Sequence, residues 1–205
     1  MDDDKKILVV CEESEVVRDA FTRAGWDAWS VDLKPSRTPG QHYHGNLFDI
    51  LGCGWNLVIA HPPCTAIAVS GNRYYAGTQA RMDGIKFVER IWFFDGYTGP
   101  LCIENPVGVL TTQSRLPVKP QYIQPYDFGE NASKKTGLWL RNLPRLRKTK
   151  YINPRMVGSK PRWDNQTDGG QNKLPPSETR AAERAVTYLG IAEAMAQQWG
   201  NYGQR

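Results

Sequence analysis

A strand, a helix and two further strands follow one another within the first sixty residues, and this pattern limits the fold more than any other feature. β-Branched and apolar runs at Lys6–Val10 and residues 56–60 predict buried strands, and residues 26–33 predict another strand between them. Residues 15–24 place their apolar side chains on one helical face, with Ser14 as a candidate N-cap. Strands that alternate with helices are typical of α/β proteins, so we expect a mostly parallel sheet with helices on both faces.

The rest of the chain predicts fewer regular elements. Residues 81–97 show helical spacing of apolar side chains, and residues 100–105 form a short apolar run that stops at a proline. Residues 153–177 are rich in Pro, Gly, Asn and Lys, which predicts a long loop, and residues 179–200 predict a helical region.

The length of 205 residues suits one well-formed core. We therefore expect a single domain over residues 6–205, with a basic, loop-rich insertion at residues 148–178. Residues 1–5, an acidic run that closes in lysine, resemble the remnant of an expression tag and are left out of the fold prediction.

The composition is that of a globular protein, with 40% hydrophobic and 23% charged residues. No apolar run approaches the ~20 residues that span a bilayer, and no apolar signal segment opens the chain. We expect no membrane association and a cytoplasmic location, in a bacterium or a phage-infected host. The four cysteines show no paired spacing, which favours reduced thiols over disulfides.

Positive charge is concentrated in one segment. The formal net charge is +5 at pH 7, but residues 115–184 carry 15 Lys and Arg against 6 Asp and Glu, a net charge of +9. The remaining residues carry 11 basic and 15 acidic side chains, a net charge of −4. Such a segment favours a polyanionic partner, nucleic acid above all, although a solvated basic surface is the alternative.

Two predicted strands end at prolines with a reactive type of side chain beside them. Pro62 and Pro63 end the strand at residues 56–60 and present Cys64 in a stiff turn, and Glu104 lies near the end of a later strand, just before Pro106. Ligands of open α/β sheets bind at the carboxyl ends of the strands, so these positions suggest a nucleophile and a carboxylate. The structural alternatives are a small buried thiol and a carboxylate that faces solvent.

The motifs "PPCTAIAVSG" at residues 62–71 and "IENPVGVL" at residues 103–110 resemble, in this order, those of DNA cytosine-5 methyltransferases. The sequence is similar to a reduced, phage-like member of that family. Weaker similarities at residues 126–140 and 187–199 extend the resemblance over most of the chain. The resemblance implies a Rossmann-like S-adenosylmethionine-dependent methyltransferase fold, S-adenosylmethionine as cofactor and DNA as partner, with no protein partner inferred.

The resemblance also implies roles for individual residues. Cys64 would add to carbon 6 of cytosine, which makes carbon 5 able to attack a sulfonium methyl, and Glu104 with Asn105 would hold the N3 edge of the base. It assigns the cofactor site to nine residues: Cys11, Glu12, Glu13, Ser14, Asp32, Leu33, Asp49, Ile50 and Pro62. We assign DNA contacts to Ser70, Lys134, Lys135, Arg155, Lys160, Arg162 and Trp163, the last as a stacking surface or as a cover of the core.

The sequence departs from the family pattern in three places. The family has a glutamine and two spaced arginines after its aromatic-Gly motif, where Ala132, Lys134 and Thr136 stand here. The loop that is Gly-rich in the family is "VCEESEVV" here, without a glycine. The large target-recognition domain is replaced by the insertion at residues 148–178, which predicts limited sequence readout. His42, His44 and Cys53 match no recognised metal-site spacing, so we expect no metal.

Two other functions are compatible with these features. An enzyme that modifies free pyrimidine nucleotides would use the same Cys64 and Glu104 and would need no recognition domain. A degenerate nucleic-acid-binding protein without cofactor would explain the glycine-free loop.

Overall fold

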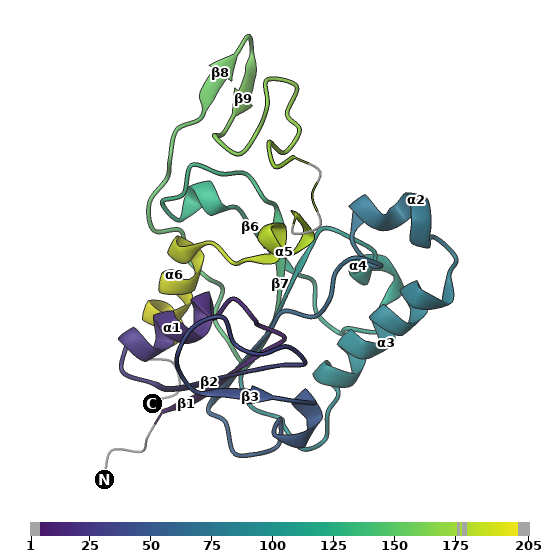
Figure 1. Cartoon of the computed structure of the whole chain (residues 1–205), viewed down its shortest axis with the longest axis vertical. Helices are drawn as coiled ribbons and strands as arrows, with labels where there is room; N and C mark the ends of the chain where they lie inside the picture. The colour runs from purple at the N-terminus through teal and green to yellow at the C-terminus, as the bar shows by residue number, and fades with distance from the viewer. Residues whose placement is uncertain (1–4, 176, 178–179, 201–205) are drawn as a thin grey trace.

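The computed structural model describes residues 5–175, 177 and 180–200, with side chains for all of them but 180–182 (Figure 1). The predicted tag remnant lies outside the described residues except for Lys5. Small parts of the predicted insertion, terminal helix and domain also lie outside them, at residues 176, 178–179 and 201–205.

The fold is α/β, with a central sheet of seven strands: β1 (Lys6–Val10), β2 (Asp27–Asp32), β3 (His42–His44), β4 (Leu57–Ala60), β5 (Leu101–Pro106), β6 (Gln121–Ile123) and β7 (Thr136–Arg141). The strand order is β3-β2-β1-β4-β5-β7-β6. The first five strands in this order are parallel, whereas β7 runs antiparallel to both β5 and β6. This arrangement confirms the predicted α/β class with a mostly parallel sheet, and it is compatible with a Rossmann-like fold.

The helices are α1 (Val16–Arg23), α2 (Asn72–Tyr75), α3 (Gln79–Trp92), α4 (Leu110–Gln113), α5 (Arg180–Ala185) and α6 (Leu189–Trp199). Three 3₁₀ turns lie at Leu47–Asp49, Val69–Gly71 and Pro125–Asp127. No helix in the described part of the chain is long and apolar enough to cross a membrane.

The two faces of the sheet pack against different helices, as Figure 1 shows for α1 and α6 on one side and α3 on the other. Alternate residues of β1 separate the two cores: Ile7 and Val9 join the cluster formed by α1 and α6, and Leu8 and Val10 join the cluster formed by α3. All four are fully buried, because successive side chains of a strand point to opposite faces. Helices on both faces were predicted and are confirmed.

Several element boundaries differ from the predictions. The helix predicted at residues 81–97 is α3, which ends at Trp92, and β5 continues through Pro106, where we predicted a break. The predicted terminal helix is two helices, with residues 186–188 between them. Pro106 is tolerated in β5 because the pairing with β7 ends there.

The predicted long loop contains a small hairpin of β8 (Arg155–Val157) and β9 (Lys160–Arg162), which projects away from the main sheet (Figure 1). Two arginines of this hairpin bond to the next turn. Arg155 pairs with the Asp168 carboxylate at 2.6 Å, and Arg162 donates to the Asp168 carbonyl at 3.0 Å. The hairpin therefore supports the segment that follows it.

The loop after β4 is tied to the loop after β5. The Val69 amide donates to the Val107 carbonyl at 2.9 Å, and the Val109 amide donates to the Ile67 carbonyl at the same distance. Gly108 lies at the crossing, and a Cβ on it would collide with the Ile67 carbonyl oxygen. The first loop contains Cys64, and the second follows the strand that carries Glu104, so the crossing fixes the relative position of these two residues.

Replacing Gly108 by alanine tests this crossing. We expect Gly108→Ala to lower the free energy of unfolding by about 1–3 kcal/mol, because backbone must move to admit the methyl group. Urea denaturation measures the change. Gly169→Ala is the matched control, since its Cβ would have its nearest neighbour at 3.8 Å, and we expect a change within about 0.5 kcal/mol. Equal stability of the two variants would contradict the close crossing.

Candidate functional site

A cleft of about 1490 Å³ opens at the carboxyl edge of the sheet. It lies where β1, β4 and β5 end, and β1 is the point at which the chain order reverses, with β2 on one side and β4 on the other. Open α/β sheets bind ligands at such a switch point. Twelve predicted site residues line the cleft: Cys11, Glu12, Glu13, Ser14, Asp32, Pro62, Cys64, Ser70, Glu104, Asn105, Lys134 and Lys135.

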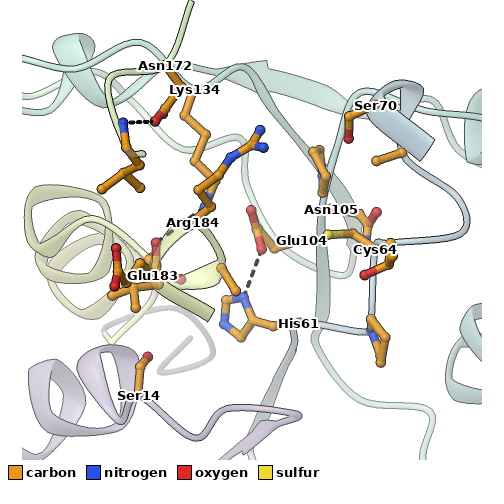
Figure 2. Close-up of a pocket in the computed structure, with 18 of the residues that line it drawn as sticks. Ser14, His61, Cys64, Ser70, Glu104, Asn105, Lys134, Asn172, Glu183 and Arg184 are labelled. Atoms are coloured by element: carbon orange, nitrogen blue, oxygen red, sulfur yellow. Dashed lines mark hydrogen bonds and ion pairs between the residues drawn. The ribbon is translucent and has the colours of Figure 1, made fainter. Parts of the chain in front are cut away.

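Cys64 stands at the tip of a tight turn that follows β4. The amides of Ile67 and Ala68 both donate to its carbonyl, at 3.0 and 2.8 Å, which closes the turn behind the two prolines. The Cys64 side chain is partly buried, and Figure 2 shows its sulfur directed to the side where Glu104 lies. Burial and the Glu104 carboxylate raise the pKa of Cys64, against the opposing charges of Lys134 and Arg184. The free thiol is therefore protonated at neutral pH.

Asn105 joins the two strand ends. Its Nδ2 donates to the Pro62 carbonyl at 2.9 Å, and the residue is 1% exposed. This bond holds β5 against the Pro-Pro-Cys turn, so Asn105 acts on Cys64 through the backbone. The buried Oδ1 of Asn105 has no hydrogen-bond partner among the described residues.

Glu104 forms an ion pair with His61, the residue directly before the two prolines. His61 Nδ1 lies 3.0 Å from Glu104 Oε2, and the side chains are 10% and 13% exposed. Burial opposes the charged form of each group, but their hydrogen bond and mutual attraction outweigh it. The pKa of Glu104 is lowered, with Lys134 adding to the effect, and the pKa of His61 is raised.

The loop from β1 to α1 has left-handed residues although it lacks glycine. Cys11 has φ 59° and Glu15 has φ 62°, values that favour glycine. Glu15 is the N-cap of α1, so the predicted cap Ser14 is wrong. The buried Glu12 carboxylate takes the capping role, because it accepts from the amides of Val17 at 2.8 Å and Arg18 at 3.1 Å.

Asp32 lies at the end of β2, beside an ion-pair cluster. Glu13 pairs with Lys34 at 2.8 Å and with Arg37, which connects the loop after β1 to the loop after β2. The Asp32 Oδ1 accepts from the Lys34 amide at 2.9 Å, and the carboxylate faces the cleft. We name this region, residues 11–14 with Asp32, Lys34 and Arg37, the β1–β2 side. It holds three carboxylates against two cations.

The opposite wall of the cleft is basic. It is formed by the residues before β7, by α5 and by residues 165–175, and its charged residues are Lys134, Lys135, Lys173, Glu183 and Arg184. We name it the β7–α5 side. Figure 2 shows Lys134 and Arg184 extending toward the space beside Glu104. Four cations against one carboxylate favour an anionic ligand here.

Seven predicted site residues lie outside the cleft lining: Leu33, Asp49, Ile50, Arg155, Lys160, Arg162 and Trp163. Leu33 is 77% exposed, and Asp49 accepts from the Tyr43 hydroxyl at 3.1 Å. Ile50 lines a separate small apolar pocket with two tryptophans. The structure therefore does not bring these three to the cleft.

Trp163 is 8% exposed and stacks on Tyr126, with 4.2 Å between the ring centroids. The predicted alternative, a tryptophan that covers the protein interior, agrees with this position. Arg155 and Arg162 hold the Asp168 turn, as described above, and Lys160 is exposed on β9. The hairpin thus contributes to the cleft through the segment that it supports.

Sequence reasoning named neither His61 nor Arg184, and within the predicted insertion at residues 148–178 it named residues of the hairpin but none of residues 165–175. His61 directly precedes the two prolines, and its short distance from Cys64 in the sequence could have marked it as a site residue. Among the described residues, no group of three or more His, Cys, Asp or Glu side chains is placed to hold a metal ion.

The sequence matches no protein-family model and no curated protein. The function must therefore be argued from the chemistry of the cleft.

The charge of Glu104 predicts the behaviour of Cys64. Replacing Glu104 by glutamine removes a negative charge that disfavours the thiolate, so we expect a lower pKa of Cys64. The rate of Cys64 alkylation by iodoacetamide at neutral pH should rise, by about tenfold for each pKa unit lost. Peptide mass spectrometry over a pH series separates Cys64 from the exposed Cys53. Glu13→Gln, the same change on the β1–β2 side, should not alter the pH dependence of Cys64 alkylation. An unchanged pH dependence in Glu104→Gln would show that the Glu104 charge does not raise the pKa of Cys64.

Proposed function

We propose that the protein transfers a methyl group from S-adenosylmethionine to carbon 5 of cytosine in DNA. The observation that carries this proposal is that Cys64, in the turn after β4, and Glu104, on β5, line one cleft at the switch point of the sheet. A thiol nucleophile beside a carboxylate is the pair that this reaction requires. The α/β sheet order is compatible with the methyltransferase fold that the resemblance implies.

The β1–β2 side fits the cofactor. Two amides at the start of α1, those of Val17 and Arg18, are already bonded to Glu12, so this helix terminus has fewer donors left for the pyrophosphate of a dinucleotide. The excess of carboxylates favours a ligand with positive charge. S-adenosylmethionine carries an ammonium and a sulfonium group, and it supplies an electrophilic methyl group when bound.

Individual residues of this side have clear uses. Asp32 stands at the end of β2, where a carboxylate accepts hydrogen bonds from ribose hydroxyls in nucleotide-binding α/β folds. Ser14 and Cys11 line the same part of the cleft and border the methionine end in this proposal. Leu33, Asp49 and Ile50 are not included, because the structure places them outside the cleft lining.

Cys64 and Glu104 act on the base. The Cys64 thiolate adds to carbon 6, and Glu104 bonds to the N3 edge of the ring. Because the pKa of the free thiol is raised, little of Cys64 is thiolate at neutral pH before substrate binds. A cytosine that bonds to the Glu104 carboxylate weakens the effect of this charge on the pKa of Cys64. Formation of the thiolate therefore follows binding of the base.

The β7–α5 side holds the nucleic acid. Lys134, Lys135, Lys173 and Arg184 supply cations at the mouth of the cleft, where phosphates would lie on either side of the target base. A base inside a duplex is not accessible to Cys64, so it has to be flipped out of the stack, which costs roughly a few kcal/mol. Cytosine in a single strand would avoid that cost.

A covalent trap tests the reaction. We expect DNA with 5-fluorocytosine and S-adenosylmethionine to form a complex with the protein that survives denaturation, because fluorine at carbon 5 prevents release of the thiol. Gel electrophoresis under denaturing conditions detects it. Cys64→Ala should form none, whereas Cys53→Ser, which changes an exposed thiol outside the cleft lining, should trap as the wild type does. No wild-type trap would refute the mechanism, and a trap only with the free 5-fluoro nucleotide would favour the nucleotide-modifying alternative.

Cofactor binding tests the β1–β2 side separately. We expect calorimetry to show binding of S-adenosylmethionine and S-adenosylhomocysteine without DNA. Asp32→Asn should weaken both by about tenfold, a loss of about 1.4 kcal/mol that fits a hydrogen bond to a charged acceptor. The matched control is Asp49→Asn, outside the cleft lining, which should bind as the wild type does. Absence of binding by the wild type would favour the degenerate-binder alternative.

A further inference from the structure

His61 is buried at the centre of the cleft with its two nitrogens in different surroundings. Nδ1 bonds to Glu104, whereas Nε2 is buried and has no hydrogen-bond partner among the described residues. Figure 2 shows the ring below Glu104, between Ser14 and the Cys64 side of the cleft. The imidazole therefore lies between the β1–β2 side and the place where the base would bind.

Charged groups from three elements face His61. Glu104 on β5 makes the direct contact, Glu12 after β1 adds a second negative charge, and Lys134 before β7 opposes them. Glu12 has a raised pKa because of its burial and the charge of Glu15, against His61 and the two capping amides. The two carboxylates outweigh both burial and Lys134, so the pKa of His61 is raised and an imidazolium is favoured.

The proposed reaction needs a proton next to Glu104. When a thiolate adds to carbon 6 of cytosine, electron density moves to N3, and N3 must take up a proton. The lowered pKa of Glu104 leaves this carboxylate ionised, so it has no proton of its own to give. Two groups bond to it: the Thr136 hydroxyl, which keeps its proton at neutral pH, and the His61 imidazolium, which can release one.

We propose that His61 is a positioning residue that orients Glu104 toward the N3 edge of cytosine and holds the proton that N3 receives through Glu104. This inference rests on the proposed function. It assigns a role to the residue that directly precedes the Pro-Pro-Cys turn. This residue follows β4, whereas Glu104 lies on β5.

The step balances in atoms and charge. The Cys64 thiol loses its proton to water, and the resulting thiolate forms the S–C6 bond. The C5=C6 pair moves to C4=C5, and the C4=N3 pair moves to N3. N3 bonds the proton that Glu104 passes on from His61 Nδ1. One anion, the thiolate, and one cation, the imidazolium, are consumed, and the adduct and imidazole are neutral while Glu104 stays ionised beside N3–H. After methyl transfer, carbon 5 loses its proton to water and the thiolate is expelled, which restores the C5=C6 bond. N3 then returns its proton through Glu104 to His61.

The variant His61→Asn separates orientation from proton storage. An asparagine amide can replace the Nδ1 donor toward Glu104, but it cannot carry a proton for transfer. We expect an unchanged KM for DNA, a kcat lower by about 100-fold, in the range of general acid catalysis, and loss of the wild-type decline of kcat as pH rises through the pKa of His61. His44→Gln is the matched control, since His44 lies outside the cleft lining, and it should keep the wild-type profile.

Nuclear magnetic resonance of the imidazoles tests the proton directly and needs neither DNA nor cofactor. The chain has three histidines, so the three titrations can be assigned by the variants. We expect the His61 resonance to titrate above the ordinary value of about 6.5 and to shift down in Glu104→Gln. A His61 that titrates at or below that value, or that ignores Glu104→Gln, would overturn the proposal.

The outcomes distinguish the two proposals. If the wild type forms no covalent trap, the proposed function fails and the catalytic role of His61 fails with it. If the wild type traps and turns over but His61→Asn keeps its kcat and pH profile, only the role of His61 is refuted. If His61→Asn has a lower kcat and also lacks the decline of kcat with rising pH, the result supports proton storage by His61 over a merely structural role.

Discussion

The burial of three ionisable side chains at one edge of the sheet is the constraint on which the site depends. Glu12, His61 and Glu104 come from the ends of β1, β4 and β5, and each would lose several kcal/mol of hydration if it were buried alone. Two sets of contacts offset this cost. His61 pairs with Glu104, and Glu12 accepts hydrogen bonds from two backbone amides. Removal of one partner from such a buried pair costs about 3–5 kcal/mol, so the strand ends are held in a fixed relation.

The same burial explains how the first loop works without glycine. Left-handed residues cost roughly 1–2 kcal/mol each when they carry a side chain, and Cys11 and Glu15 both take this conformation. The chain has to turn sharply between β1 and α1 for Glu12 to accept hydrogen bonds from the start of the helix. Arg18 also pairs with the buried Glu15, at 3.1 Å. The absence of glycine was the weakest point of the sequence argument. The loop keeps its geometry through side-chain contacts that one sequence does not reveal.

The sequence predicted what depends on local pattern and missed what depends on distant partners. Runs of β-branched and apolar residues such as Lys6–Val10 predicted the parallel strands, and the two prolines predicted the turn at Cys64. The three-residue strands β3, β6 and β8 were missed because they exist only through hydrogen bonds to neighbouring strands. The sequence left Trp163 as either a stacking surface for DNA or a cover of the core. Its stacking partner Tyr126 lies 37 positions earlier in the chain, so only the fold could distinguish the two.

The basic segment shows why net charge alone overstates the capacity to bind nucleic acid. Several of its cations have internal uses: Arg141 donates to three backbone carbonyls, Lys148 pairs with Asp127, and Arg155 pairs with Asp168. The cations that face the cleft are a minority of the 15 in the segment. Because each phosphate contact releases counterions and steepens the dependence of affinity on salt, a small set of contacts implies a shallower dependence than a +9 segment suggests. In the proposed function, the DNA contacts therefore belong at the mouth of the cleft, beside the reacting base, and not on the projecting hairpin.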